Sequence, residues 1–125
     1  MNKKTRIAIN GFGRIGRIFF RYAFGHPDLE FVAINDLGSV ENLAYLLKYD
    51  TVYGRYEKSV EIAGGKLKVE GYEISVICEK DPGALPWKNM DIDIVVESTG
   101  VFESKDEAEP HITAGAKRVV ITAPA

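Results

Sequence analysis

The chain has 125 residues, 46% of them hydrophobic and 27% charged, and a formal net charge of -2; these values fit one ordinary globular domain and exclude a disordered chain. No Lys/Arg cluster runs along the chain, so nucleic-acid binding has no electrostatic basis, and no apolar run has the length of a signal peptide or a membrane span. The single cysteine, Cys78, excludes an internal disulfide framework and a cysteine-based zinc cluster, so we expect no metal site and a cytoplasmic protein that contacts no membrane.

The first 50 residues alternate between strand and helix patterns. Residues 5–9 are apolar and β-branched and predict a strand, and the period changes to that of a helix from Arg14. One face of this helix is expected to carry five side chains: Ile15, Ile18, Phe19, Tyr22 and Ala23. Residues 29–35 predict a second strand, and Ser39 is placed to cap a helix over 40–49.

The second half opens with a hairpin signal, since apolar and polar residues alternate on both sides of Gly64 and Gly65. The pattern then predicts a strand over 72–78, an irregular segment over 79–87, a strand over 91–99, a polar helix over 104–114 and a last strand within 116–125. This order is typical of the α/β class: a doubly wound, mostly parallel Rossmann-type sheet with an inserted antiparallel hairpin, helices on both faces, and one domain over 1–125.

Three glycines, in the stretch "INGFGRIGR", follow the first predicted strand. In a doubly wound sheet, Gly11 allows the tight turn, Gly13 lets the backbone approach a pyrophosphate, and Gly16 lets the helix pack closely on the sheet. The helix N-terminus presents free N–H groups, first those of Arg14 and Ile15, and the positive end of its dipole. This pattern predicts a dinucleotide site.

An acidic residue at the end of the second strand supports that interpretation. Asp36 lies 20 residues beyond Gly16, where a carboxylate accepts hydrogen bonds from both hydroxyls of an adenosine ribose. The same charge repels a 2′-phosphate, which favours NAD over NADP. The plainer alternative makes the glycines a structural turn and Asp36 a solvated strand end.

Six motifs in order, "INGFGRIGR", "VAINDL", "LLKYDTVYGR", "EKDPGALPW", "VVESTGVF" and "VVITAPA", resemble the NAD-binding part of the phosphorylating glyceraldehyde-3-phosphate dehydrogenase family, a glycolytic enzyme. The resemblance covers essentially the whole chain and implies NAD as cofactor. It implies the following cofactor-binding residues: Asn10, Gly11, Phe12, Gly13, Arg14, Ile15 and Gly16 around the pyrophosphate, Asp36 on the ribose, Lys80 near the adenine, Ser98, Thr99, Gly100 and Phe102 along the cofactor, and Thr122 at the nicotinamide end.

The resemblance also implies what this chain does not contain. The family's catalytic cysteine, in a Ser-Cys-Thr-Thr-Asn motif, is expected soon after "ITAPA", and the histidine that activates it lies in a second domain. The implied reaction is attack of a thiolate on the aldehyde, hydride transfer to NAD and phosphorolysis of the thioester. We therefore expect a truncated NAD-binding domain without catalytic residues, inactive alone and prone to self-association, whereas the family is homotetrameric.

Other candidate groups have simpler explanations. Cys78 ends an apolar strand and is expected to be a small buried residue, while His26 and His111 have no nucleophile beside them and are expected to face solvent. The alternatives that stay open are a standalone dinucleotide-binding or regulatory module, the related erythrose-4-phosphate dehydrogenase, and an interaction protein that keeps the fold without binding NAD.

Overall fold

A computed structural model describes residues 4–50, 54–56, 58–98 and 105–121 of the chain. Its elements are β1 Thr5–Asn10, α1 Arg14–Ala23, β2 Leu29–Asn35, α2 Val40–Lys48, β3 Tyr49–Asp50, β4 Gly54–Arg55, β5 Val60–Ala63, β6 Lys66–Val69, β7 Tyr72–Ile77, the 3₁₀ turn η1 Pro82–Ala84, β8 Ile94–Glu97, α3 Lys105–Thr113 and β9 Arg118–Ile121. Most predicted elements are confirmed within one or two residues.

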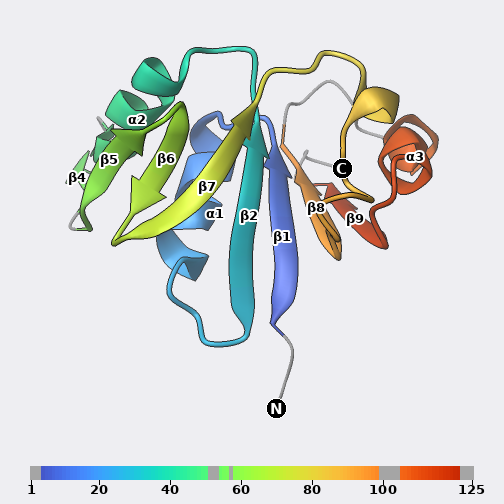
Figure 1. Ribbon diagram of the computed structural model, residues 1–125, viewed down its shortest axis with the longest axis horizontal. Coiled ribbons are helices and arrows are strands. Elements are labelled where there is room, and N and C mark those ends of the chain that lie inside the picture. The colour runs from blue at the N-terminus through green and yellow to red at the C-terminus, as the bar shows by residue number, and fades with distance from the viewer. Residues whose placement is uncertain (1–3, 51–53, 57, 99–104, 122–125) are drawn as a thin grey trace.

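The strands form one twisted sheet that runs across the molecule (Figure 1). Within the described residues it has seven strands in the order β5-β6-β7-β2-β1-β8-β9, beside a small β3-β4 pair. The pairs β7-β2, β2-β1, β1-β8 and β8-β9 are parallel, whereas β5-β6, joined by the turn at Gly64 and Gly65, and β6-β7 are antiparallel. This is the expected doubly wound sheet with an inserted hairpin.

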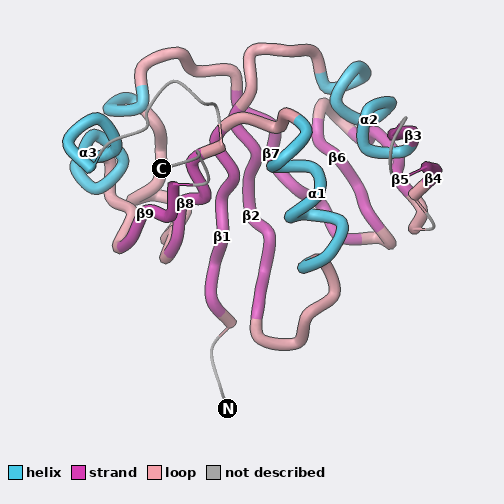
Figure 2. The backbone as a smooth tube through the Cα atoms, turned by 180° about the vertical axis from the view of Figure 1, so that it is seen from behind, coloured by secondary structure: helices cyan, strands magenta, loops and turns pink. Residues whose placement is uncertain are grey.

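Apolar clusters cover both faces of the sheet, as the fold class requires. On one face, α1 and α2 bury Phe20, Leu43 and Leu47 against strand residues such as Ile9; α1 lies over this face in Figure 2. On the other face, Trp87 and Ile92 pack with small residues of the central strands. Ser39 caps α2, as predicted, because its side chain accepts a hydrogen bond from the backbone N–H of Asn42.

A bulge in β2 places Phe31 and Ile34 on the same face of the sheet. The pairing of β1 with β2 runs from Ile7↔Phe31 directly to Ala8↔Ala33, so Val32 is an extra residue. Phe31 and Ile34 then pack in the same cluster, although they are three positions apart and regular alternation would place them on opposite faces.

The predicted inward face of α1 is wrong in part. Ile15 is 52% exposed and Tyr22 is 82% exposed, while the buried residues are Gly16 and Phe20. The helix is rotated because Gly16 brings its first turn against the sheet, and Phe20 then fits between Phe12 and Phe31. The spacing of apolar residues along α1 does not predict the rotation that results when Gly16 packs against the sheet.

Two boundaries differ from the sequence prediction. The strand expected over 91–99 begins only at Ile94, because Asp91 has a positive φ of 54° and the residues before it fold into a turn. The segment 79–87, expected to be irregular, contains η1. Pro82 suits the first position of such a turn, since its fixed φ is already helical. Among the described helices, none is both long and apolar enough to cross a membrane.

Candidate dinucleotide-binding site

The site predicted from the glycines lies where the strand order reverses. β1 connects to β2 on one side and has β8 on its other side, so the carboxyl ends of β1 and β8 meet at the switch point of the sheet. There the hydroxyl of Ser98, which follows β8, donates to the carbonyl oxygen of Gly11 at 2.5 Å. The backbone N–H of Ser98 donates to the backbone carbonyl oxygen of Asn10 at 2.9 Å. The two loops that follow these strands are thus held together.

The three glycines occupy different environments. Gly11 has a φ of 90°, which an L side chain rarely adopts. A Cβ at Gly16 would lie 2.6 Å from the carbonyl oxygen of Gly11 and 2.8 Å from Oγ of Ser98, so the helix packs there at glycine distance. A Cβ at Gly13 would meet no described atom within 4 Å. The turn and the close packing are therefore confirmed, and the space beside Gly13 is open.

The first turn of α1 faces that open space. Gly13 is the N-cap in an extended conformation, and among the described residues no side chain caps this end of the helix. Arg14 and Ile15, the first two helical residues, are both exposed. Their backbone N–H groups and the helix dipole suit an anion such as a pyrophosphate.

Phe12 connects this loop to both the core and Asp36. Its ring is 1% exposed and packs edge-on against Phe20 with a centroid separation of 5.8 Å. Its backbone N–H donates to Oδ2 of Asp36 at 2.7 Å, and its carbonyl oxygen accepts from Arg17 at 3.0 Å. The side chain of Phe12 is thus structural, and its backbone N–H and carbonyl groups are both paired within the protein.

Asp36 lies at the carboxyl end of β2, as predicted, and is partly exposed. Besides the Phe12 amide, its carboxylate accepts the backbone N–H of Gly38 at 2.9 Å. A carboxylate has about four acceptor positions, so two are left for ribose hydroxyls. The residue therefore holds the glycine loop and remains able to bind a sugar.

The other predicted residues are placed less fully. Lys80 is exposed in the loop after β7, on the far side of β2 from the glycines. The side chain of Asn10 is 4% exposed and points into the protein, where it binds other side chains. Four predicted residues lie outside the described part of the chain: Thr99, Gly100, Phe102 and Thr122.

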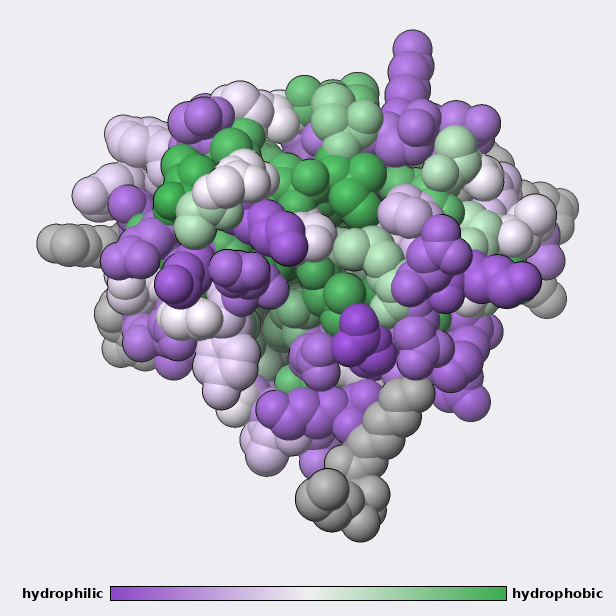
Figure 3. Space-filling view, in the orientation of Figure 1, coloured by the Kyte–Doolittle hydropathy of each residue, from purple (hydrophilic) through white to green (hydrophobic). Residues whose placement is uncertain are grey.

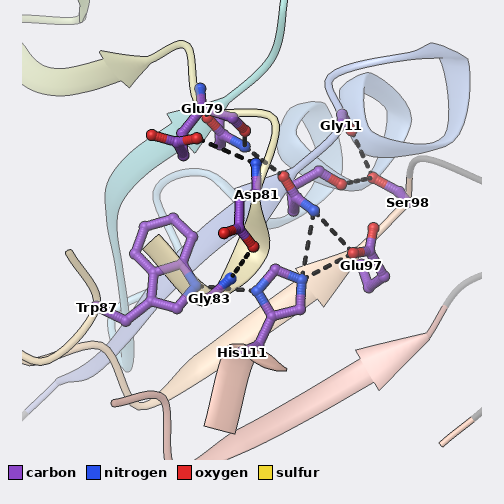
Figure 4. Close-up of polar contacts among 10 residues, drawn as sticks. Gly11, Glu79, Asp81, Gly83, Trp87, Glu97, Ser98 and His111 are labelled. Atoms are coloured by element: carbon purple, nitrogen blue, oxygen red, sulfur yellow. Dashed lines mark hydrogen bonds and ion pairs between the residues drawn. The ribbon is translucent and has the colours of Figure 1, made fainter. Parts of the chain in front are cut away.

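A row of buried polar side chains lies just beneath these strand ends (Figure 4). Asn10 donates to Oε1 of Glu97 at 2.7 Å and accepts from Nδ2 of Asn35 at 2.7 Å. Nε2 of His111 lies 2.8 Å from the same Oε1 of Glu97, and Nδ1 of His111 accepts from the indole of Trp87 at 3.0 Å. We call these five residues the polar row.

His111 and Cys78 correct the sequence prediction. His111, expected to face solvent, is fully buried, because it is the α3 residue that meets Glu97 and Trp87. Cys78, expected to be buried, is exposed, because β7 ends one residue earlier and the thiol lies at the rim of the sheet. His26 is exposed, as expected. The sequence pattern did not single out Glu97; its one signal is that a charged residue ends the apolar run "IVV" of residues 94–96.

A parallel sheet whose first strand leads through three glycines into an uncapped helix, with an acid ending the second strand, defines a Rossmann-type dinucleotide-binding domain. The family model described as "Glyceraldehyde 3-phosphate dehydrogenase, NAD binding domain" matches residues 5–105. The chain belongs to this family, and NAD is the cofactor of its domain.

Curated relatives agree with the family model. The chain is 54% identical over 123 residues to glyceraldehyde-3-phosphate dehydrogenase of Thermotoga maritima, 55% over 119 residues to the cytosolic enzyme of Trypanosoma brucei brucei, and 52% over 121 residues to glyceraldehyde-3-phosphate dehydrogenase 2 of Bacillus subtilis. These matches cover 95–97% of this chain but only 36–37% of each relative. They favour this family over the erythrose-4-phosphate enzyme and over a standalone regulatory module.

Proposed function

We propose that residues 1–125 form the NAD-binding domain of a phosphorylating glyceraldehyde-3-phosphate dehydrogenase and that this chain binds NAD without catalysing the reaction. NAD acts as the hydride acceptor when it is bound. The role of this chain is to hold and orient that acceptor. The observation that carries the proposal is the open space beside Gly13 at the uncapped N-terminus of α1.

The proposed contacts follow from the described geometry. The amides of Arg14 and Ile15 bind the pyrophosphate, and the two remaining acceptor positions of Asp36 bind the adenosine ribose. Ser98 orients the loop carbonyl of Gly11. We extend the proposal to Lys80 at the adenine, and to Thr99, Gly100, Phe102 and Thr122 along the cofactor, on the resemblance alone.

Catalysis of aldehyde oxidation is proposed for the whole protein. The curated relatives are almost three times as long as this chain, so the thiolate nucleophile and its activating histidine are assigned to a second domain. Cys78 is not assigned this role, because it lies at the end of β7 rather than beside β1 and β8.

Calorimetric titration of the chain with NAD, and in parallel with NADP, tests the binding. We expect saturable binding of NAD and much weaker binding of NADP, since Asp36 repels a 2′-phosphate. No binding of NAD by a chain that circular dichroism shows to be folded would refute the proposal.

A substitution at Gly13 separates binding from folding. Gly13→Ser introduces a favoured N-cap residue where a Cβ meets no described atom, so stability is expected to stay the same or to rise by a few tenths of a kcal/mol. The side chain fills the proposed pyrophosphate space, and NAD affinity is expected to fall at least tenfold. Gly83→Ser, at an exposed position outside the proposed contacts, is the matched control. Unchanged NAD affinity in Gly13→Ser would argue against a pyrophosphate at this position.

Self-association is proposed from the face of the sheet that Trp87 and Ile92 cover only in part, within the described residues. Figure 3 shows hydrophobic side chains gathered over the middle of the face where β7, β2 and β1 lie in Figure 1. Val32 and Ile77 on this face are only partly buried. Apolar patches of this kind favour association in water. Sedimentation velocity at increasing concentration is expected to show species larger than 13.9 kDa.

A further inference from the structure

The polar row joins strand ends that are separate in the sequence. Asn10, Asn35 and Glu97 each occupy the last position of a strand, and in each case the next residue is a proposed NAD contact: Gly11, Asp36 and Ser98. The row also reaches the segment after β7. The side-chain amide of Asn35 donates to the carbonyl oxygen of Glu79 and accepts from its N–H, both at 2.9 Å, and Lys80 follows Glu79.

The far end of the row determines its hydrogen-bond directions. The indole of Trp87 can only donate, so Nδ1 of His111 accepts and carries no proton. The ring proton therefore lies on Nε2, which donates to Oε1 of Glu97. Asn10 donates to the same oxygen, and its own Oδ1 accepts from Asn35. Each of these four hydrogen bonds thus has one donor and one acceptor, with the direction set from Trp87 at one end and Glu79 at the other. Nδ2 of Asn10 and Nε2 of His111, which lie 3.3 Å apart, both donate to Oε1 of Glu97.

Burial makes this arrangement stiff. Glu97 is 1% exposed and His111 is fully buried, so water does not compete for their hydrogen bonds. Hydrogen bonds depend on direction, whereas apolar packing does not. The row therefore adds directional side-chain hydrogen bonds between strand ends that the backbone pairing already places side by side, Asn10 opposite Asn35 and opposite Glu97.

We propose that Glu97 and His111 are positioning residues for NAD binding: through Asn10 and Asn35 they hold the glycine loop, the Asp36 turn and the Ser98 loop in the relative positions that one dinucleotide spans. This inference rests on the proposed function, because the polar row acts on NAD only through the proposed contacts at Gly11, Asp36 and Ser98. It assigns no contact between the polar row and NAD. It adds two residues that the glycine pattern does not contain.

The test replaces the shared acceptor of the row. Glu97→Met keeps the length of the side chain and removes the oxygen, and we expect NAD affinity to fall about tenfold, the lower end of what loss of an orienting partner costs at metal sites. Glu97→Gln keeps an oxygen for Asn10 and His111 and is expected to restore most of the affinity. Ile92→Ala is the control. Ile92 packs in the same apolar cluster as Trp87 but lies outside the row, so this variant is expected to lower stability without lowering the NAD affinity of the folded chain.

Two further readouts do not depend on NAD. Amide hydrogen exchange at Phe12, whose N–H binds Asp36, is expected to accelerate in Glu97→Met relative to global unfolding, and not in Ile92→Ala. Nitrogen NMR of His111 in the parent chain is expected to show an unprotonated Nδ1 and a protonated Nε2. Parent-like NAD affinity together with parent-like exchange at Phe12 in Glu97→Met would overturn the inference.

A second variant keeps the test decisive if Glu97→Met does not fold. Trp87→Phe keeps an aromatic ring but removes the indole N–H, and is expected to shift the Nδ1 resonance of His111 and to weaken NAD binding several-fold. Parent-like NAD affinity in this variant would overturn the inference. If the folded parent chain itself does not bind NAD, the proposed function fails, whereas the exchange of the Phe12 amide still reports whether the row positions the loop.

Discussion

Replacement of Gly16 by alanine is expected to destabilise the chain, against the usual preference of helices. Alanine in a helix interior is favoured over glycine by about 1 kcal/mol. Here the new Cβ would lie 2.6 Å from the carbonyl oxygen of Gly11 and 3.2 Å from Cγ2 of Ile9, whereas ordinary contact begins at 3.4 Å. The neighbour that must move by about 0.8 Å is backbone, not the end of a flexible side chain.

The cost of that movement is expected to exceed the helix preference. Overpacking typically costs about 1–3 kcal/mol, and displacing the Gly11 carbonyl also disturbs its hydrogen bond from Ser98, worth about 1 kcal/mol. We therefore expect a net loss of about 1–3 kcal/mol of unfolding free energy, measured by urea denaturation followed by circular dichroism. Gly13→Ser is the control, since its Cβ meets no described atom and serine is favoured at this N-cap position. A Gly16→Ala variant as stable as the parent would refute the reasoning.

Three further substitutions test individual contacts. Asp36→Asn leaves one acceptor where the carboxylate now serves two backbone amides, one of them that of Phe12. It is expected to lose about 1–3 kcal/mol in urea denaturation and to weaken NAD binding in calorimetry; improved NADP binding at full stability would contradict this. Ser39→Ala removes the cap of α2 and is expected to cost about 1 kcal/mol in the same urea assay, with Ser39→Asp restoring it. The pKa of Lys117 is raised above 10.5 by its hydrogen bond to Asp93 and by the charge of Asp93, so its stabilisation is present below pH 10.5 and is lost as pH rises through the folded-state pKa. As pH is raised from neutral, the stability difference between the parent and Lys117→Gln is therefore expected to close only above pH 10.5; a difference that closes between neutral pH and 10.5 would contradict this.

The elements with local signals were predictable from the sequence. β1, α1, β2 and the hairpin at Gly64 and Gly65 follow from periodicity, caps and turn residues, each within a few positions along the chain. The glycine pattern likewise predicted the tight turn at Gly11 and the close packing at Gly16. These features depend on residues that are neighbours in the sequence, so the sequence alone predicts them.

The polar row was not predictable in this way. Asn10 and Glu97 are 87 positions apart, and their contact exists only because β1 and β8 are neighbours in the sheet. His111 lies in a helix of weak amphipathic pattern, so nothing near it in the sequence indicates burial. Cys78 was misplaced for the opposite reason, since one residue beyond the end of a strand is enough to exchange burial for exposure.

The extra residue in β2 determines which side chain reaches the cofactor site. Alternation along a strand means that a shift of one position exchanges the two faces for every residue that follows. Without the bulge at Val32, Asn35 would take the orientation that Asp36 now has, and the acid would point toward the polar row. Deletion of Val32 would therefore leave Ala33, Ile34 and Asn35 opposite their present partners in β1, whereas a β2 that paired regularly through Val32 would invert the chemistry of the strand end while keeping every functional residue in the sequence.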